Sequence, residues 1–255
     1  IRGDTTNLQI VVAEGMLYGE NTDNALGTNV LVQTGGILGG FGSARTFSMP
    51  VTLNGGTLAA RTGGGSPTWM SRITLAADSF MNTAPGYGYA NEDIVVRGLV
   101  TGPGKLTKRG GGAFRLFNTN NYAGGTVVEN SGGSLVLAST NGPAIQGNVV
   151  LGHLADGGGV AYLSPTNHNQ FSAGAVLDFR GSPNDWSWLK LFGTTQTVGS
   201  IVSDAYFDED GAPVAKGVGG FARVEFQYDD SGSATKFTYR TADGSGGWSG
   251  ATSGF

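Results

Sequence analysis

Glycine recurs at near-constant intervals beside short apolar patterns of similar form, and this recurrence constrains the fold more than any other feature. Gly-Met-Leu at 15–17, Gly-Ile-Leu at 36–38 and Gly-Thr-Leu at 56–58 begin 21 and then 20 residues apart. A later pair at 112–114 and 133–135 is again offset by 21 residues. In a solenoid, each turn of the chain repeats the same strands and corners and stacks on the previous turn at a distance of about 4.8 Å. A repeat of about 20 residues is typical of one such turn. The spacing therefore predicts a coil of short strands.

Apolar and polar residues alternate in runs too short for helices, for example at 51–53, 73–75, 114–116 and 135–137. Gly-Gly, Asn-Gly and Pro-containing turns separate these runs, which is typical of strands of three to five residues. The sequence predicts an all-β fold with stacked inward ladders of apolar residues. Their expected members are Leu53, Leu58, Leu75, Leu106, Leu116, Leu135, Leu137, Val149, Leu151 and Leu177.

The last fifty residues follow a different pattern. Residues 222–228 alternate strictly, a turn follows at 229–233, and residues 236–240 alternate again, which predicts an antiparallel hairpin. Residues 244–255 form a Gly/Ser-rich tail. We place a boundary near residue 200. Residues 1–200 then form the solenoid, and residues 201–255 form the hairpin and tail, packed on the solenoid or continuing it.

Composition excludes several classes of protein. The net charge of -4 argues against nucleic acid as a partner, and the charged fraction of 13 % with 39 % apolar residues predicts neither disorder nor a membrane span. The chain has no cysteine, so disulfides and thiolate metal sites are excluded. No cofactor is expected. A cysteine-free, Gly/Thr/Asn/Ser-rich β chain is common among exported bacterial surface proteins.

Residues 102–116 (GPGKLTKRGGGAFRL), 121–128 (NYAGGTVV) and 133–137 (GSLVL) resemble the autotransporter-associated β-strand repeat. The resemblance covers roughly residues 8 to 203. It departs from the usual pattern at Ala113-Phe114, where the family generally has Thr-Leu. The resemblance implies a right-handed parallel β-helix in a secreted or surface-displayed bacterial protein. Because this repeat occurs in adhesins, enzymes and structural proteins, it does not imply a single function.

A run of cations is the first candidate ligand site, since no acidic residue occurs between Asp93 and Glu129. Its members are Arg97, Lys105, Lys108, Arg109 and Arg115. On adjacent rungs these cations could line up and attract an acidic glycan or anionic membrane sugars. Alternatively, they are isolated solvated charges that discourage association through strand edges.

Aromatic residues are the second candidate, because their rings can stack on sugars. Trp69 and Trp248 stand in Gly/Ser-rich stretches and are expected to be exposed. Trp188 belongs to an alternating stretch at 186–191 and is expected in the core.

Two further groups are weaker candidates. The acidic stretch at 204–211 contains Asp208 and Asp210, which could hold Ca²⁺, but its spacing differs from an EF-hand loop and also fits a solvated turn. The two histidines, His153 and His168, stand in no catalytic motif and are expected in surface turns.

These observations favour a non-catalytic extracellular module, a rigid β-solenoid segment used for display, adhesion or filament-like assembly. The alternative is a β-helix protein that binds or cleaves polysaccharides. Terminal rungs expose strand edges, and strand-like residues begin at Leu8 with no amphipathic helix before them. We therefore expect the chain to continue in a longer protein or to join another copy head to tail.

Overall fold

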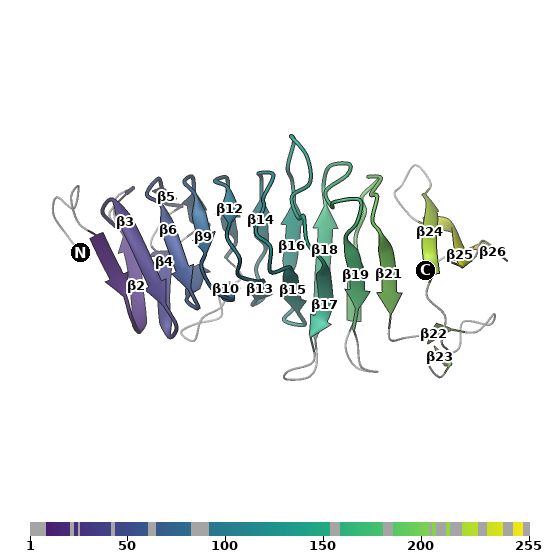
Figure 1. Cartoon of the computed structure of the whole chain (residues 1–255), viewed down its shortest axis with the longest axis horizontal. Helices are drawn as coiled ribbons and strands as arrows, with labels where there is room; N and C mark the ends of the chain where they lie inside the picture. The colour runs from purple at the N-terminus through teal and green to yellow at the C-terminus, as the bar shows by residue number, and fades with distance from the viewer. Residues whose placement is uncertain are drawn as a thin grey trace.

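The computed structural model describes residues 9–20, 23–24, 26–41, 44–60, 65–82, 92–153, 159–180 and 186–203. Beyond residue 203 it describes the backbone of segments 206–207, 213–214, 221–228, 234–241 and 247–251. The described part is all-β, and its parallel sheets form a β-solenoid of about seven turns (Figure 1). The prediction of an all-β solenoid is confirmed.

Three parallel sheets form the sides of the solenoid. Sheet A contains β1 (Gln9–Val12), β3 (Asn29–Gln33), β6 (Val51–Asn54), β9 (Ile73–Leu75) and β12 (Val100–Thr101). Sheet B contains, within the solenoid, β2 (Gly15–Glu20), β4 (Gly36–Phe41), β7 (Thr57–Ala60), β10 (Ser79–Asn82), β13 (Leu106–Arg109), β15 (Thr126–Glu129), β17 (Val149–His153), β19 (Val176–Phe179) and β21 (Ser200–Ser203). Sheet C contains β5 (Thr46–Phe47), β8 (Thr68–Trp69), β11 (Ile94–Val96), β14 (Phe114–Leu116), β16 (Ser134–Leu137), β18 (Val160–Pro165) and β20 (Trp186–Leu189). A complete rung visits the three sheets in this order.

The remaining strands lie beyond residue 203. They are β22 (Tyr206–Phe207), β23 (Pro213–Val214), β24 (Phe221–Tyr228), β25 (Ala234–Thr241) and β26 (Gly247–Ala251). The backbones of β24 and β25 pair antiparallel. The division of the chain near residue 200 stays a prediction.

Successive rungs pair residues that lie 20 to 28 positions apart. Gln9 pairs with Asn29, Phe114 pairs with Leu135, and Leu135 pairs with Leu163. The first two offsets match the glycine period. The longest offset belongs to a rung that includes residues 154–158, outside the described residues. The longer rung still pairs β16 with β18 in continuous register.

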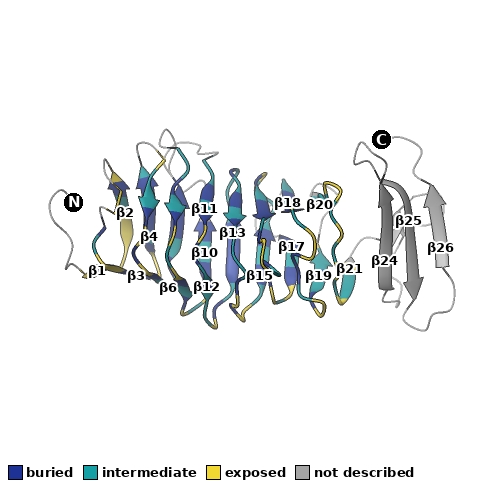
Figure 2. Cartoon of the chain, turned by 90° about the horizontal axis from the view of Figure 1, so that it is seen from above, coloured by how far each residue is buried: buried dark blue, intermediate teal, exposed yellow. Residues whose placement is uncertain are grey.

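The core is one continuous apolar cluster inside the solenoid, and the buried strand segments that line it are dark blue along the length of the solenoid in Figure 2. All ten residues expected in the inward ladders are fully buried, so that prediction is confirmed. Several of them stack directly on consecutive strands, as Leu53 does on Leu75 and Val149 on Leu177. Because one rung cannot cover its own apolar face, the core forms only through stacking.

Side-chain amides link the rungs where sheet A ends. One rung after β12, the buried Asn120 accepts a hydrogen bond from the Val100 N–H at 2.8 Å and donates one to the Ala144 carbonyl at 2.9 Å. The side-chain amide of Gln170 accepts a hydrogen bond from the Ser139 N–H at 2.8 Å and donates one to the Ser139 carbonyl at 3.0 Å. These amides satisfy buried backbone groups that lack a neighbouring strand. They allow the solenoid to continue without a regular third sheet.

Replacing an inward leucine should cost far more stability than replacing its outward neighbour on the same strand. Leu53 is fully buried, whereas Thr52 on β6 faces outward and is partly exposed. We expect Leu53→Ala to lower the free energy of unfolding by about 2–5 kcal/mol. Thr52→Ala is the control and should change it by less than about 1 kcal/mol. Denaturant titration followed by circular dichroism measures both. Equal losses would contradict the assignment of the inward face.

Candidate functional site

The cations of the predicted basic run do not form a continuous positive face. Three of them pair with carboxylates on neighbouring rungs: Lys105 with Asp78 at 3.0 Å, Arg109 with Glu129 at 2.7 Å, and Arg115 with Asp93 at 2.8 Å. Hydrogen bonds from the backbone N–H and then the ammonium of Lys105 lower the pKa of the Asp78 carboxyl. The charge that looked unbalanced along the chain is thus largely neutralised across the rungs.

Arg97 lies apart from these pairs. Arg97 is exposed, and its guanidinium carbon lies 4.4 Å from the centroid of the Phe117 ring. The ion pairs identified among the described residues do not include it. Of the five predicted cations, Arg97 fits best the expectation of an isolated solvated charge.

Lys108 is buried, contrary to its expected place on a cationic surface. On β13 it shares the inward parity of Leu106, and it stacks between Met81 of β10 and Val128 of β15. Side chains on one face of a strand recur every two residues, so the position that buries Leu106 also buries Lys108. The neighbours of the lysine on both adjacent rungs of this column are therefore apolar.

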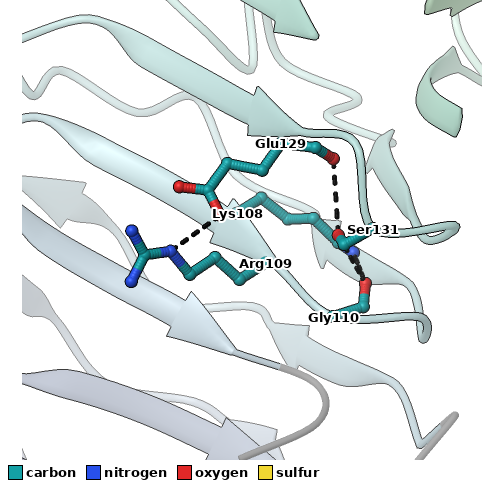
Figure 3. A network of polar contacts seen from close by, with 5 residues as sticks. All are labelled: Lys108, Arg109, Gly110, Glu129 and Ser131. Atoms are coloured by element: carbon teal, nitrogen blue, oxygen red, sulfur yellow. Dashed lines mark hydrogen bonds and ion pairs between the residues drawn. The ribbon is translucent and has the colours of Figure 1, made fainter. Parts of the chain in front are cut away.

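The ammonium of Lys108 reaches the corner between sheets B and C, where it donates a hydrogen bond to the carbonyl oxygen of Gly110 (Figure 3). Ser131 donates to the same carbonyl at 3.2 Å. Arg109 and Glu129 form their ion pair on the outer side of this corner. A Cβ at Gly133 would collide with the Lys108 Nζ, so the absence of a side chain there makes room for the amine.

Burial lowers the pKa of the Lys108 ammonium to about 7, while the carboxylates of Asp93 and Glu129 partly oppose the shift. A neutral amine near pH 7 is a base and a nucleophile. However, this amine is enclosed and donates to a backbone carbonyl, so its evident role is to hold the corner.

The aromatic expectations are partly wrong. Trp69 is 1 % exposed and stacks on Phe47 with ring centroids 4.5 Å apart, because both belong to an inward column of sheet C. Conversely, Trp188 is 47 % exposed rather than part of the core. The register explains this, since Leu163 pairs with Leu189 and places Trp188 on the outward parity. Trp248 falls on β26, and its side chain lies outside the described residues.

The weaker candidates have different outcomes. Asp208 and Asp210 lie outside the described residues, as does the side chain of His153. His168 is exposed, as expected, and its Nδ1 accepts a hydrogen bond from the Thr195 N–H at 2.9 Å. Among the described residues, no group of three or more His, Asp or Glu side chains is placed to hold a metal ion. No helix in the described part of the chain is long and apolar enough to cross a membrane.

The buried lysine makes stability depend on pH. An unfolded lysine has a pKa near 10.5, whereas folded Lys108 titrates near 7. Between these values the unfolded chain binds a proton that the folded chain does not, so the free energy of unfolding should rise with pH. We expect a rise from pH 7 to pH 9 that is absent in Lys108→Met, a variant of similar length without an amine.

Denaturant titrations across this pH range measure the effect. Below pH 10 the tyrosine Tyr122, whose pKa is raised by burial, does not interfere. Arg115→Met is the control because it removes a cation from the outer face and should keep the rise. A pH slope unchanged by Lys108→Met would contradict the buried neutral amine.

Comparison with known proteins supports a loose relationship to autotransporters. Two curated proteins, both named Neisserial autotransporter lipoprotein NalP, are 31 % identical to this chain over 109 residues. They come from Neisseria meningitidis serogroup B (strain ATCC BAA-335 / MC58) and serogroup B / serotype 15 (strain H44/76). The match covers 39 % of this chain and 10 % of each relative, so the chain corresponds to a small part of their length. No family model matches the chain. No solved structure matches it either.

Proposed function

We propose that this chain is an exported structural and interaction module, a rigid β-solenoid that displays its outer faces at the surface of a bacterium or in the extracellular space. The observation that carries the proposal is the stack of parallel rungs around one continuous core. The partial similarity to autotransporter lipoproteins supports an exported location. Right-handed winding and a C-terminal hairpin packed on or continuing the last rung are part of the same proposal.

The geometry suits a spacer because contacts between rungs are local and repeated. Each rung contacts its neighbours through three strands or through two strands and an amide link. A solenoid of this kind lengthens by adding rungs without needing a larger core. Pairing of acids and bases across rungs adds order at the corners, although exposed pairs of this kind contribute at most about 1 kcal/mol each.

Association through the ends belongs to this proposal as well. Strand β20 is the last strand of sheet C in the described part of the chain. A strand at the edge of a sheet can pair with another strand through its free backbone groups. Filament-like assembly or continuation in a longer chain would satisfy such edges.

The second candidate, a protein that binds or cleaves polysaccharides, rests on the exposed aromatic and cationic side chains. Cleavage by a β-helix enzyme would require carboxylates or a base gathered on one face. The carboxylates at the basic run are instead occupied by ion pairs at neighbouring rungs. We therefore propose a non-catalytic role.

The exported location predicts that this segment is exposed on intact cells of the source organism or released into their medium. An antibody raised against the purified chain should detect it on unpermeabilised cells, where added protease abolishes the label, or in the cell-free medium. A cytoplasmic protein in the same cells serves as the control and should be labelled only after lysis. Detection of the segment only after lysis would contradict export.

A non-catalytic role predicts that the purified chain releases no new reducing ends or unsaturated products from polygalacturonate, alginate or dextran. Heat-denatured protein provides the background. Release above that background would favour the enzymatic alternative, without bearing on where the protein is located.

A further inference from the structure

Two large aromatic side chains are exposed near the C-terminal end of the described solenoid. Trp188 of β20 is 47 % exposed, and Phe192, in the turn that follows this strand, is 66 % exposed. Strands β18 and β20 lie next to each other there (Figure 2). The two positions lie four residues apart in the chain, and exposed aromatic residues that occur close together are more informative than single apolar residues, which are common on surfaces.

A third ring comes from the neighbouring strand. Tyr162 of β18 pairs in register with Trp188 of β20. The next pair in the register, Leu163 and Leu189, packs toward the core. Side chains alternate along a strand, so Tyr162 and Trp188 both lie on the outer face of sheet C. Adjacent strands are about 4.8 Å apart, which places the rings on consecutive steps of one column.

A cation completes the surface. The Nζ atom of Lys190 lies 3.7 Å from the centroid of the Tyr162 ring. Lys190 is absent from the ion pairs identified in the described part of the chain, unlike Lys105, Arg109, Arg115 and Arg180, which each pair with a carboxylate. A contact with an aromatic face leaves ammonium N–H groups able to donate to another partner.

The backbone holds Phe192 in an unusual conformation. Its φ of 47° lies in the left-handed region, which is uncommon for bulky side chains and raises the free energy of the fold. A tight turn fixes this geometry, since the Thr194 N–H and hydroxyl both donate to the Leu191 carbonyl, at 2.8 and 2.6 Å. Phe192 therefore combines a strained backbone conformation with a largely exposed side chain.

We propose that Trp188, Tyr162, Phe192 and Lys190 form a binding surface for an acidic polysaccharide. The aromatic rings supply exposed apolar surface for the C–H faces of sugar rings. Lys190 supplies the positive charge that a uronate carboxylate requires. Charge complementarity favours an acidic glycan over a neutral one. This inference goes beyond the display role and does not depend on where the protein is located.

The surface differs from the sites expected from the sequence. The basic run is largely neutralised, and Trp69 is buried. The four residues lie instead between positions 162 and 192, on two rungs that are joined by the register.

Titration of the purified chain with an oligogalacturonide, followed by tryptophan fluorescence and calorimetry, tests the proposal. We expect saturable binding that weakens as salt increases, because screening reduces the contribution of the ammonium. Trp188→Ala should weaken binding at least tenfold. Lys190→Gln should also weaken it and flatten the salt dependence, while it retains the aromatic surface. An uncharged dextran oligosaccharide of equal length should bind at least tenfold more weakly.

Arg97→Gln is the matched control, because Arg97 is an exposed cation that, like Lys190, lies over an aromatic ring. It should leave binding unchanged. Unaltered circular dichroism spectra and melting of each variant separate loss of binding from loss of fold. The proposal is overturned by absence of binding, by equal binding of dextran, or by binding that survives both Trp188→Ala and Lys190→Gln. Concentration-dependent sedimentation abolished by Trp188→Ala would also overturn it, because the surface would then be an interface between copies.

Discussion

Parallel backbone hydrogen bonding between successive rungs is the interaction on which the rest of this structure depends. It pairs each strand residue between neighbouring rungs with one that lies 20 to 28 positions away. A slip of one residue would turn every inward side chain of a strand to solvent, and the stacked apolar column opposes such a slip. Where sheet A ends after β12, amide side chains such as Asn120 and Gln170 bind backbone groups across the rungs.

The same register decides which charges are neighbours. Positions 94–128 contain basic residues and no acid, yet Arg109 and Arg115 meet Glu129 and Asp93 from adjacent rungs. A local excess of charge along a solenoid chain therefore does not predict a charged surface. The charge of a surface region depends on all the side chains that stack there from several rungs, and not on residues that are neighbours in the sequence. Lys190, in contrast, directs its ammonium to the ring of Tyr162.

Much of the solenoid could be predicted from the sequence, because the glycine period and the apolar alternation express one physical requirement. The outcome for single side chains depended on parity. Lys108 lies two residues after the buried Leu106, so the alternation along β13 alone predicts that its side chain points inward. Its expected place was on the surface because lysine side chains are usually exposed. Trp188 and Lys190 are two residues apart and lie on the same side of the chain. Because a lysine is usually exposed, this spacing indicates that Trp188 also faces outward. Burial of Trp69 was not predictable, since β8 has two residues and shows no alternation before its pairing with β5 and β11 is known.

Disulfide cross-linking across rungs tests the register most directly, because the natural chain contains no cysteine. Thr52, Thr74 and Thr101 pair in succession on the outer face of sheet A. Cysteines at 52 and 74 would stand on adjacent strands, within the distance that a disulfide spans, whereas those at 52 and 101 would stand two strands apart. Under mild oxidation, mass spectrometry should show an intramolecular disulfide in Thr52→Cys/Thr74→Cys and none in Thr52→Cys/Thr101→Cys. A disulfide in the second variant but not in the first would contradict the stacked-rung structure.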